Sequence, residues 1–189
     1  MLELSLGIIG KMSNTITLTG FPKNKDKYLK LIDFFKEVLE ICDNLGVESI
    51  VDGGLAVFAY TQDSELVVGD IDTGFPEVDF PRMIKALEER GIEYKLMDWH
   101  VLRVLRDDLK IELGSVEYWY KDWPISLETL QLDTRQVKML GLESLIEFYR
   151  RGMESKAKEA NESEGKRAKY EDLKAKYEKL RGLKRLSPT

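Results

Sequence analysis

The sequence has very few cysteine and histidine residues, and this excludes several kinds of site. Cys42 is the only cysteine among 189 residues, so no internal disulfide can form, which suits a reducing compartment. It lies at an apolar position of a helical repeat, where a core role is favoured over a reactive one. His100 is the only histidine, so no metal site can be built around it, and we expect a structural role.

The sequence also gives no sign of a membrane anchor at its start. The opening stretch, MLELSLGIIG, is too short to span a bilayer and lacks a basic leader. Apolar residues make up 43% of the chain and charged residues 33%, as in globular proteins. We therefore expect a cytoplasmic protein with no membrane partner, built on one core or on a core domain with a helical appendage.

Charge is distributed unevenly along the chain. Residues 150–189 hold 13 Lys and Arg against 7 Asp and Glu, a net of +6, which leaves −11 for residues 1–149. An acidic, metal-binding domain followed by a basic segment would suit a polyanionic nucleotide. Solvated charged helices explain most of these lysines equally well. General nucleic-acid binding through the basic tail is a weaker alternative, because the acidic part would oppose it.

Residues 50–72, IVDGGLAVFAYTQDSELVVGDID, predict a strand, a glycine pair, a short helix, a loop and a second strand. Gly53 and Gly54 lack a Cβ and would let backbone amides approach a phosphate at the positive end of the helix. Alternatively, they form only a tight turn. Asp70 and Asp72 are two residues apart in an extended segment, so both carboxylates would face the same side, with the residue between them in the core.

A third acid follows on a later predicted strand. In the segment LKIELGS, Glu112 lies between Ile111 and Leu113, so it would project away from the apolar face. Carboxylates held together repel one another, and a cation relieves this; such oxygen ligands suit Mg²⁺ bound together with substrate phosphates. The alternative is an edge-strand acid paired with Lys110, its neighbour on the same face.

These parts resemble the polymerase-β-like nucleotidyltransferase superfamily. Its pattern is a hydrophobic residue, Gly, then Gly or Ser, a spacer, Asp-x-Asp and a third acid on a neighbouring strand. The resemblance covers residues 30–180 and is strongest to the small prokaryotic branch of minimal, antibiotic and abortive-infection toxin-type enzymes. It implies an α/β (α+β) nucleotidyltransferase fold, with a small mixed β-sheet, helices packed on it, and C-terminal helices.

The resemblance also implies a chemistry. A nucleoside monophosphate would pass from an NTP, with ATP the expected donor, to an acceptor hydroxyl by a two-metal mechanism. Glu112 would also help to deprotonate the attacking hydroxyl. The expected site residues are Asp70, Asp72 and Glu112 for catalysis and for two Mg²⁺ ions, and Gly53, Gly54 and Lys110 for the nucleotide.

Several questions stay open at this point. The acceptor could be a small molecule, a tRNA end or a protein side chain, and a homodimer is not excluded. The alternative function is a catalytically silent member of the fold that acts as a binding or interaction module. Further candidates for nucleotide contact, each with a plain salt-bridge explanation, are Arg103, Arg106, Arg150, Arg151, Lys166, Lys169 and Asp172. The aromatic residues Trp119, Tyr120 and Trp123 would stack a ring, cap the sheet or form a dimer contact.

Periodicity and turn residues predict the order of elements. We divide the chain into an N-terminal strand extension (1–24), a nucleotidyltransferase core (25–125), and a hairpin with a helical segment (126–189). Helices are predicted at 25–44, 54–62, 81–90, 142–152 and 166–180. Strands are predicted at 3–9, 15–19, 48–52, 92–98, 100–107 and 109–115, with one from Leu66 that Gly74 and Pro76 break, and a hairpin at 127–140.

Overall fold

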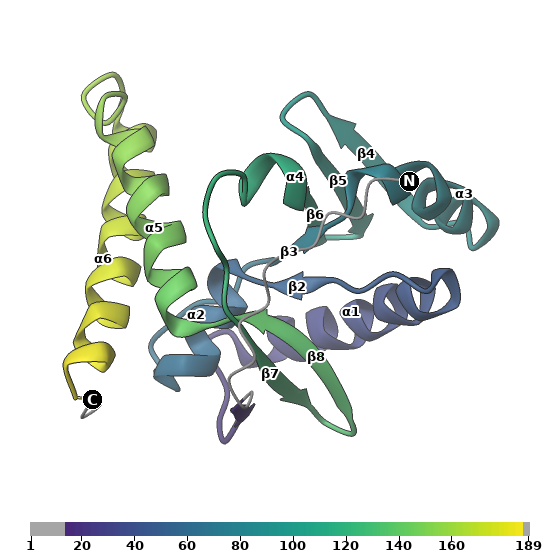
Figure 1. The fold of residues 1–189 in the computed structure, drawn as a ribbon, viewed down its shortest axis with the longest axis horizontal. Helices are drawn as coiled ribbons and strands as arrows, with labels where there is room; N and C mark the ends of the chain where they lie inside the picture. Colours follow the sequence, from purple (N-terminus) through teal and green to yellow (C-terminus); the bar gives the residue numbers. More distant parts are fainter. Residues whose placement is uncertain (1–13, 187–189) are drawn as a thin grey trace.

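The computed structural model describes residues 14–186, and their strands form one eight-stranded mixed sheet in the order β1-β7-β8-β2-β3-β6-β5-β4 (Figure 1). The strands are β1 (Thr15–Thr17), β2 (Ile50–Val51), β3 (Ile71–Phe75), β4 (Glu93–Met97), β5 (Val101–Arg106), β6 (Leu109–Ser115), β7 (Leu127–Leu132) and β8 (Arg135–Leu140). The predicted mixed sheet is confirmed. The strand predicted at 3–9 lies outside the described residues.

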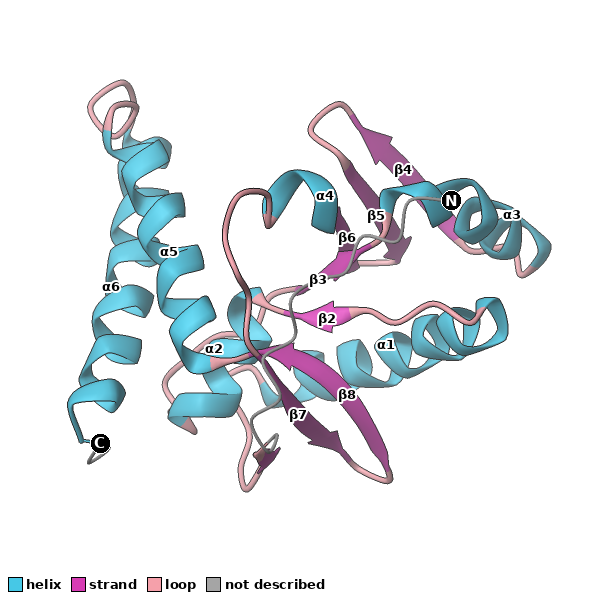
Figure 2. Cartoon of the chain, in the orientation of Figure 1, coloured by secondary structure: helices cyan, strands magenta, loops and turns pink. Residues whose placement is uncertain are grey.

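Helices surround this sheet (Figure 2). They are α1 (Lys25–Leu45), α2 (Gly53–Thr61), α3 (Phe80–Glu89), the short α4 (Val116–Trp119), α5 (Leu142–Ala157) and α6 (Glu164–Leu186), with a single 3₁₀ turn, η1 (Glu77–Asp79). The first three helices begin and end within one residue of their predicted bounds. The predicted hairpins at Asp107 and at 127–140 are also confirmed.

Helix α1 supplies much of the core. Apolar residues that recur every three or four positions form its buried stripe, and Leu31, Phe35 and Val38 are fully buried. The helix ends at Gly46, whose φ of 67° is a left-handed cap conformation that glycine adopts without strain. Cys42 is buried on the same stripe, and burial raises the pKa of its thiol to about 12. The thiol is therefore an unreactive part of the core, as expected.

The start of β3 differs from the prediction. The strand begins at Ile71 rather than Leu66, and Gly74 lies within it. The preceding segment is held by a side chain instead of a neighbouring strand: Nδ2 of Asn24 donates to the carbonyl of Val68 at 2.8 Å, and its Oδ1 accepts from the Val68 amide at 3.1 Å. The Asn24 side chain thus takes the place of a neighbouring strand. Hydrophobic periodicity in the sequence cannot distinguish this kind of pairing from pairing within a sheet.

The C-terminal part of the chain is joined to both the sheet and α2. Strand β8 runs parallel to β2, with Ile50 opposite Lys138, so the hairpin shares the central sheet. Helices α5 and α6 lie side by side at the left of Figure 1 and both contact α2. Leu145 and Leu180 are completely buried in this region. The division of the chain into three segments stays a prediction.

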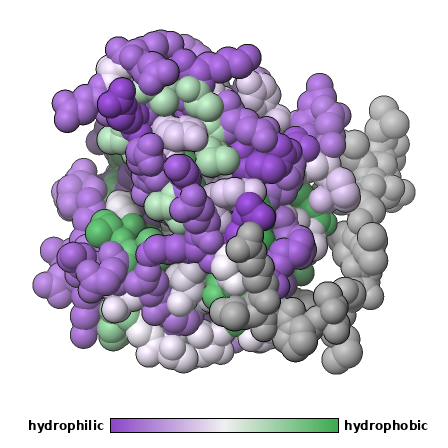
Figure 3. All heavy atoms as spheres, turned by 90° about the vertical axis from the view of Figure 1, so that its left-hand side faces the viewer, coloured by the Kyte–Doolittle hydropathy of each residue, from purple (hydrophilic) through white to green (hydrophobic). Residues whose placement is uncertain are grey.

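The outer side of the helix pair is charged. Figure 3 looks onto the α5–α6 side and shows mostly hydrophilic residues with separate hydrophobic spots. This agrees with the amphipathic pattern of both helices. Their apolar residues pack against the core, where the two helices contact each other and α2. Within residues 14–186, no helix combines the length and the apolar character that crossing a membrane requires.

Candidate active site

Three acids lie in a row across three neighbouring strands. The parallel pairing of β3 with β6 places Asp72 opposite Glu112. Strand β2 is antiparallel to β3, and the amide of Asp52, directly after β2, donates to the carbonyl of Asp72 at 3.0 Å. Residues directly opposite each other project from the same face of a sheet. We call Asp52, Asp72 and Glu112 the acid row.

Two basic side chains bind the acids on this face. Nζ of Lys110 lies 2.6 Å from Oδ2 of Asp70 and 3.2 Å from Oε1 of Glu112. Arg103, opposite Glu112 on β5, donates to the same Oε1 from Nε at 2.9 Å and from Nη2 at 2.6 Å. Lys110 therefore connects Asp70 to the acid row. The three predicted acids, Asp70, Asp72 and Glu112, thus lie close together near the start of β3.

The residue between the two predicted metal ligands confirms the geometry of the segment. Ile71 is fully buried, whereas Asp70 and Asp72 are only partly buried, which is the alternation expected of an extended chain. Asp70 itself stands just before β3, because the strand begins at Ile71. The tripeptide thus presents both carboxylates outward and anchors itself through its central side chain.

Asp72 experiences the strongest repulsion in the site. Burial, and then the carboxylates of Asp70, Asp52 and Glu112, raise the pKa of Asp72 well above its ordinary value, while Lys110 opposes the effect. Repulsion of this kind is relieved by a cation or a proton. An all-oxygen donor set is also what a hard divalent cation such as Mg²⁺ prefers. The donor chemistry of the residues therefore fits such an ion.

Between residues 14 and 186, no group of three or more Asp, Glu, His or Cys side chains has metal-binding geometry. Oxygens of Asp70 and Glu112 contact Lys110 and Arg103 instead. Burial lowers the pKa of Lys110, but its contacts with these carboxylates outweigh burial and raise it, so the side chain stays an ammonium.

The glycine turn lies directly against Asp72. Gly53 has a φ of 57°, and a Cβ at this position would lie 2.1 Å from Oδ2 of Asp72, so no other residue fits without displacing the carboxylate. A Cβ on Gly54 would have no heavy atom within 4 Å. Helix α2 begins here, and the first amides of a helix have no partner within it. The backbone amides at the start of α2 and the carboxylate of Asp72 therefore lie at the same turn.

Asp52 and Tyr120 also lie at the site, although Asp52 was not predicted and Tyr120 was expected to stack a ring, cap the sheet or form a dimer contact. The hydroxyl of Tyr120 donates to Oδ2 of Asp52, and its ring lies over Gly74, where a Cβ would be 2.5 Å from the ring. Burial raises the pKa of Asp52 to about 7, although the Tyr120 hydrogen bond acts in the opposite direction. Asp52 could have been found from its place between a strand and the glycine pair, which sets it opposite Asp72.

The other aromatic candidates have different environments. Trp119 lies over Gly114, the partner of Gly74 in β6, and stays 42% exposed, so its ring is accessible. Tyr120 is buried and has no free face. His100, at the β4–β5 turn, stacks on Tyr118 with ring centroids 4.3 Å apart, and its Nδ1 lies 2.8 Å from Oε1 of Glu77. These contacts agree with the structural role expected for His100.

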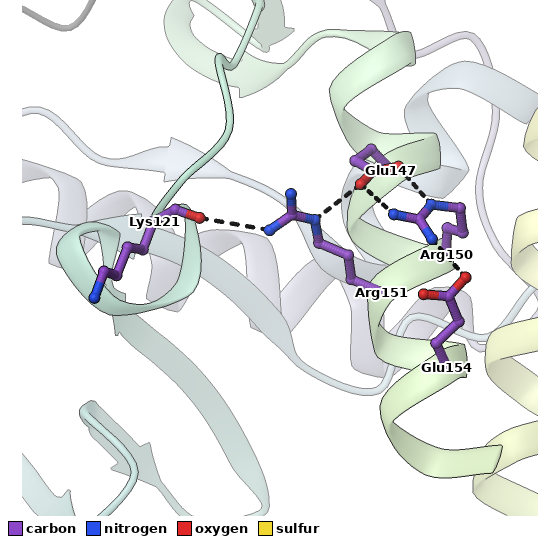
Figure 4. A network of polar contacts seen from close by, with 5 residues as sticks. All are labelled: Lys121, Glu147, Arg150, Arg151 and Glu154. Carbon is purple, nitrogen blue, oxygen red and sulfur yellow. Dashed lines mark hydrogen bonds and ion pairs between the residues drawn. The ribbon is translucent and has the colours of Figure 1, made fainter.

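The candidate arginines on α5 bind groups outside the acid row (Figure 4). Arg150 donates to Glu147 at 2.6 and 2.7 Å and also contacts Glu154, both on its own helix. Arg151 donates to Glu147 at 2.8 Å, and its guanidinium lies 4.5 Å from the centre of the Trp123 ring. Arg151 thus connects α5 to the loop that follows α4.

The remaining charged candidates have partners outside the acid row or are exposed. Arg106 forms a double ion pair with Glu37 of α1, at 2.5 and 2.7 Å. Lys166 binds Glu162 at 2.5 Å. Asp172, the acidic candidate, binds Lys176 at 2.8 Å, one turn further along α6. Lys169 is exposed on the same helix. Among the basic side chains proposed from the sequence, Lys110 and Arg103 are the two that the structure brings to the acids.

Helix α5 contributes one further residue near the acids. Tyr149 is buried, and burial raises the pKa of its phenol well above the ordinary value. The carboxylates of Asp72, Asp52 and Asp172 add to this shift. No sequence pattern signals this role, because Tyr149 fits equally well as an ordinary core position of an amphipathic helix.

The comparison with protein families decides the relationship. The family described as aminoglycoside-2''-adenylyltransferase matches residues 34–165, more than half of the chain, including the glycine turn and the acids. The chain belongs to this family. Membership confirms the resemblance to small polymerase-β-like nucleotidyltransferases. It relates the chain to antibiotic adenylyltransferases and supports nucleotidyl transfer as the general class of chemistry. Comparison with curated protein sequences gives no match.

Solved structures show that this member of the aminoglycoside-2''-adenylyltransferase family has a nucleotidyltransferase fold. An antigenic nucleotidyltransferase-like protein from Paracoccidioides brasiliensis is 13% identical, with a TM-score of 0.55 over 85% of this chain and 78% of its own. A candidate nucleotidyltransferase from Thermotoga maritima is 18% identical, with a TM-score of 0.50 over 71% and 90%. The antibiotic-resistance factor ANT(2'')-Ia is 13% identical, with a TM-score of 0.49 over 82% and 89%.

Proposed function

We propose that the protein transfers a nucleoside monophosphate from an NTP, with ATP as the preferred donor, to an acceptor hydroxyl. The observation that carries the proposal is the pairing of Asp72 with Glu112 on adjacent parallel strands, with Asp72 packed against Gly53. A phosphate held by the amides of the glycine turn would lie beside these carboxylates. Positioning and charge stabilisation dominate phosphoryl transfer, and this arrangement supplies both.

Each site residue predicted from the sequence has a role in this proposal. The amides at Gly53 and Gly54 would donate to the β- and γ-phosphates at the start of α2. Lys110 would neutralise the triphosphate, and Glu112 would accept the proton of the attacking hydroxyl. Asp70, Asp72 and Glu112 would hold two Mg²⁺ ions, which neutralise charge on the transferred phosphoryl group when they are bound.

The acceptor in this proposal is the hydroxyl of a small molecule. The family description names aminoglycosides, which favours a small-molecule hydroxyl over a tRNA end or a protein side chain. The C-terminal helices would close the site, and the contacts of α5 and α6 with α2, the helix that begins at the glycine turn, support this arrangement. Specificity for the acceptor would then depend on α4, the loop after it, and α5.

The test is transfer of label from ATP labelled at the α-phosphate, assayed with panels of aminoglycosides, lincosamides, tRNA and lysate protein. The double variant Asp70→Asn and Asp72→Asn should lose all labelling that the wild-type chain shows. Asp133→Asn is the matched control, because Asp133 lies at the β7–β8 turn, pairs with Lys36 and has a φ of 58°, which Asn tolerates. Labelling that survives the double substitution would contradict the proposal.

One observation favours the alternative of a catalytically silent binding module. The acids are already paired with Lys110 and Arg103, as in a structural ion-pair network. Calorimetry with Mg²⁺ and each NTP separates the two functions. A silent module would give no heat that depends on the triphosphate, whereas the enzyme would bind Mg·NTP and lose this binding in the double variant.

A further inference from the structure

The ammonium of Lys110 stands between two carboxylates that the proposed reaction assigns to metal ions. It lies 2.6 Å from Oδ2 of Asp70 and 3.2 Å from Oε1 of Glu112. A cation of the protein thus already lies where a divalent cation would find its oxygen ligands. Arg103 also donates to Oε1 of Glu112, at 2.6 Å.

Lys110 can leave this position more easily than Arg103. Its side chain is 33% exposed, as is that of Asp70, so water reaches the contact. A lysine is a point charge on a flexible stem, whereas Arg103 holds one oxygen of Glu112 with two N–H groups. Lys110 is therefore the mobile cation of the site and Arg103 the fixed one.

The charge balance decides when Lys110 would move. A divalent cation that entered alone would have to displace Lys110 from both carboxylates and would leave two cations close together. A triphosphate that entered with the metal would offer Lys110 new phosphate oxygens on the same face, beside the glycine turn. The same displacement is then compensated, because each cation ends next to an anion.

We propose that Lys110 occupies the position between Asp70 and Glu112 until a metal–triphosphate complex enters, so that the site binds divalent cation weakly alone and tightly together with nucleotide. The inference rests on the proposed function and specifies the form of its donor substrate. It makes Lys110 a positioning residue that keeps the acids in place before the substrate binds.

The experiment measures Mn²⁺ binding to the full chain by calorimetry and electron paramagnetic resonance, without any acceptor and without a reaction. Lys110→Met should bind Mn²⁺ alone at least tenfold more tightly than wild type, because the competing cation is gone. Lys110→Gln provides a second variant if the methionine form folds poorly. Lys138→Met is the matched control, since Lys138 lies on β8 and pairs with Glu48 away from the site.

A second arm adds a non-hydrolysable ATP analogue. Wild type should bind Mn²⁺ at least tenfold more tightly with the analogue than without it, and this gain should shrink in Lys110→Met. If removal of Lys110 leaves the affinity for Mn²⁺ alone unchanged or weaker, the inference is wrong. Should wild type still bind Mn²⁺ with the analogue, and lose this in Asp70→Asn with Asp72→Asn, the proposed function survives that failure. Absence of all binding would overturn both.

Discussion

Gly53 is the residue whose backbone lies directly against the carboxylate of Asp72. Its φ of 57° and the 2.1 Å that would separate an added Cβ from Oδ2 of Asp72 exclude any side chain. Gly53→Ala should therefore destabilise the fold by at least about 1–2 kcal/mol, the cost of a left-handed residue, and displace Asp72 as well. We expect lower stability in urea unfolding and loss of Mg·ATP binding by calorimetry.

The neighbouring glycine provides the control for this prediction. A Cβ on Gly54 meets open space and its φ is not positive, so Gly54→Ala should keep the fold intact and gain up to about 1 kcal/mol from the better helix propensity of alanine. If both substitutions affected stability equally, the specific contact between Gly53 and Asp72 would not be the cause.

The raised pKa of Asp52 predicts that the stability of the fold depends on pH. Burial raises the pKa of Asp52 from 3.8 to about 7, so the folded chain holds this proton more tightly than the unfolded chain. Its contribution is fully present below pH 3.8 and is lost as the pH rises to about 7. Asp52→Asn cannot ionise and keeps an oxygen for Tyr120. The variant should gain stability relative to wild type across this range, by about 1.4 kcal/mol for each unit of raised pKa.

The measurement is urea unfolding of both proteins at several pH values in the presence of a chelator. Asp72 is present in both proteins, but the Asp52 carboxylate contributes to its raised pKa, so Asp52→Asn should also lower the pKa of Asp72 and add to the difference in stability. A difference in stability that stays constant between pH 4 and pH 8 would show that Asp52 ionises normally.

Among single residues, the sequence was sufficient to predict which way the acids in a short local pattern project. Asp70 and Asp72 are close in the chain, and the alternation of LKIELGS places Glu112 outward. Asp52 and Tyr120 were not predicted as a pair, because 68 positions separate them and their contact depends on the β2–β3 register and on the cover that Tyr120 gives to Gly74. Nothing local in the sequence encodes that contact.

At the element scale, the loop after α4 is held to α5 through Arg151, as Figure 4 shows. Its guanidinium lies over Trp123 and donates to the carbonyl of Lys121 at 3.4 Å. Arg151→Ala should cost about 0.5–1 kcal/mol and accelerate amide hydrogen exchange in residues 121–126. Arg150→Ala is the control, because its contacts stay within α5; equal exchange in the two variants would contradict the role given to Arg151.

Element boundaries could be predicted wherever the pattern depends on one segment alone. The repeat of α1 and the left-handed glycine at Gly46 fix that helix without any knowledge of its neighbours. The start of β3 depends on tertiary structure, since Asn24 holds Val68 in place of a strand. Gly74 was predicted to end the strand but lies within it. A glycine is needed here because the ring of Tyr120 fills the space that a side chain would take.

At the scale of the whole molecule, the basic excess of the C-terminal segment is partly neutralised within the chain. Lys179 on α6 pairs with Asp63 after α2, and Lys184 pairs with Glu143 on α5 at 2.6 Å. These contacts support the simpler of the two explanations for the charge distribution, in which the lysines belong to the packing of the helices. They also show why a count of charges along the sequence could not decide between packing and nucleotide binding.

Whether the C-terminal helices unfold together with the sheet tests the division of the chain at residue 125. Leu180 of α6 is completely buried beside α5 and α2, so Leu180→Ala should cost about 2–5 kcal/mol. All tryptophans lie before residue 126, so fluorescence follows the core together with the contact of Trp123 with α5, while far-UV circular dichroism also follows the helices as a whole. Because α2 connects the glycine turn to both helices, we expect both signals to shift to the same lower urea midpoint. The exposed Glu178→Ala should leave the midpoint nearly unchanged. A shift seen only by circular dichroism would mean that residues 126–189 form a separately folding unit.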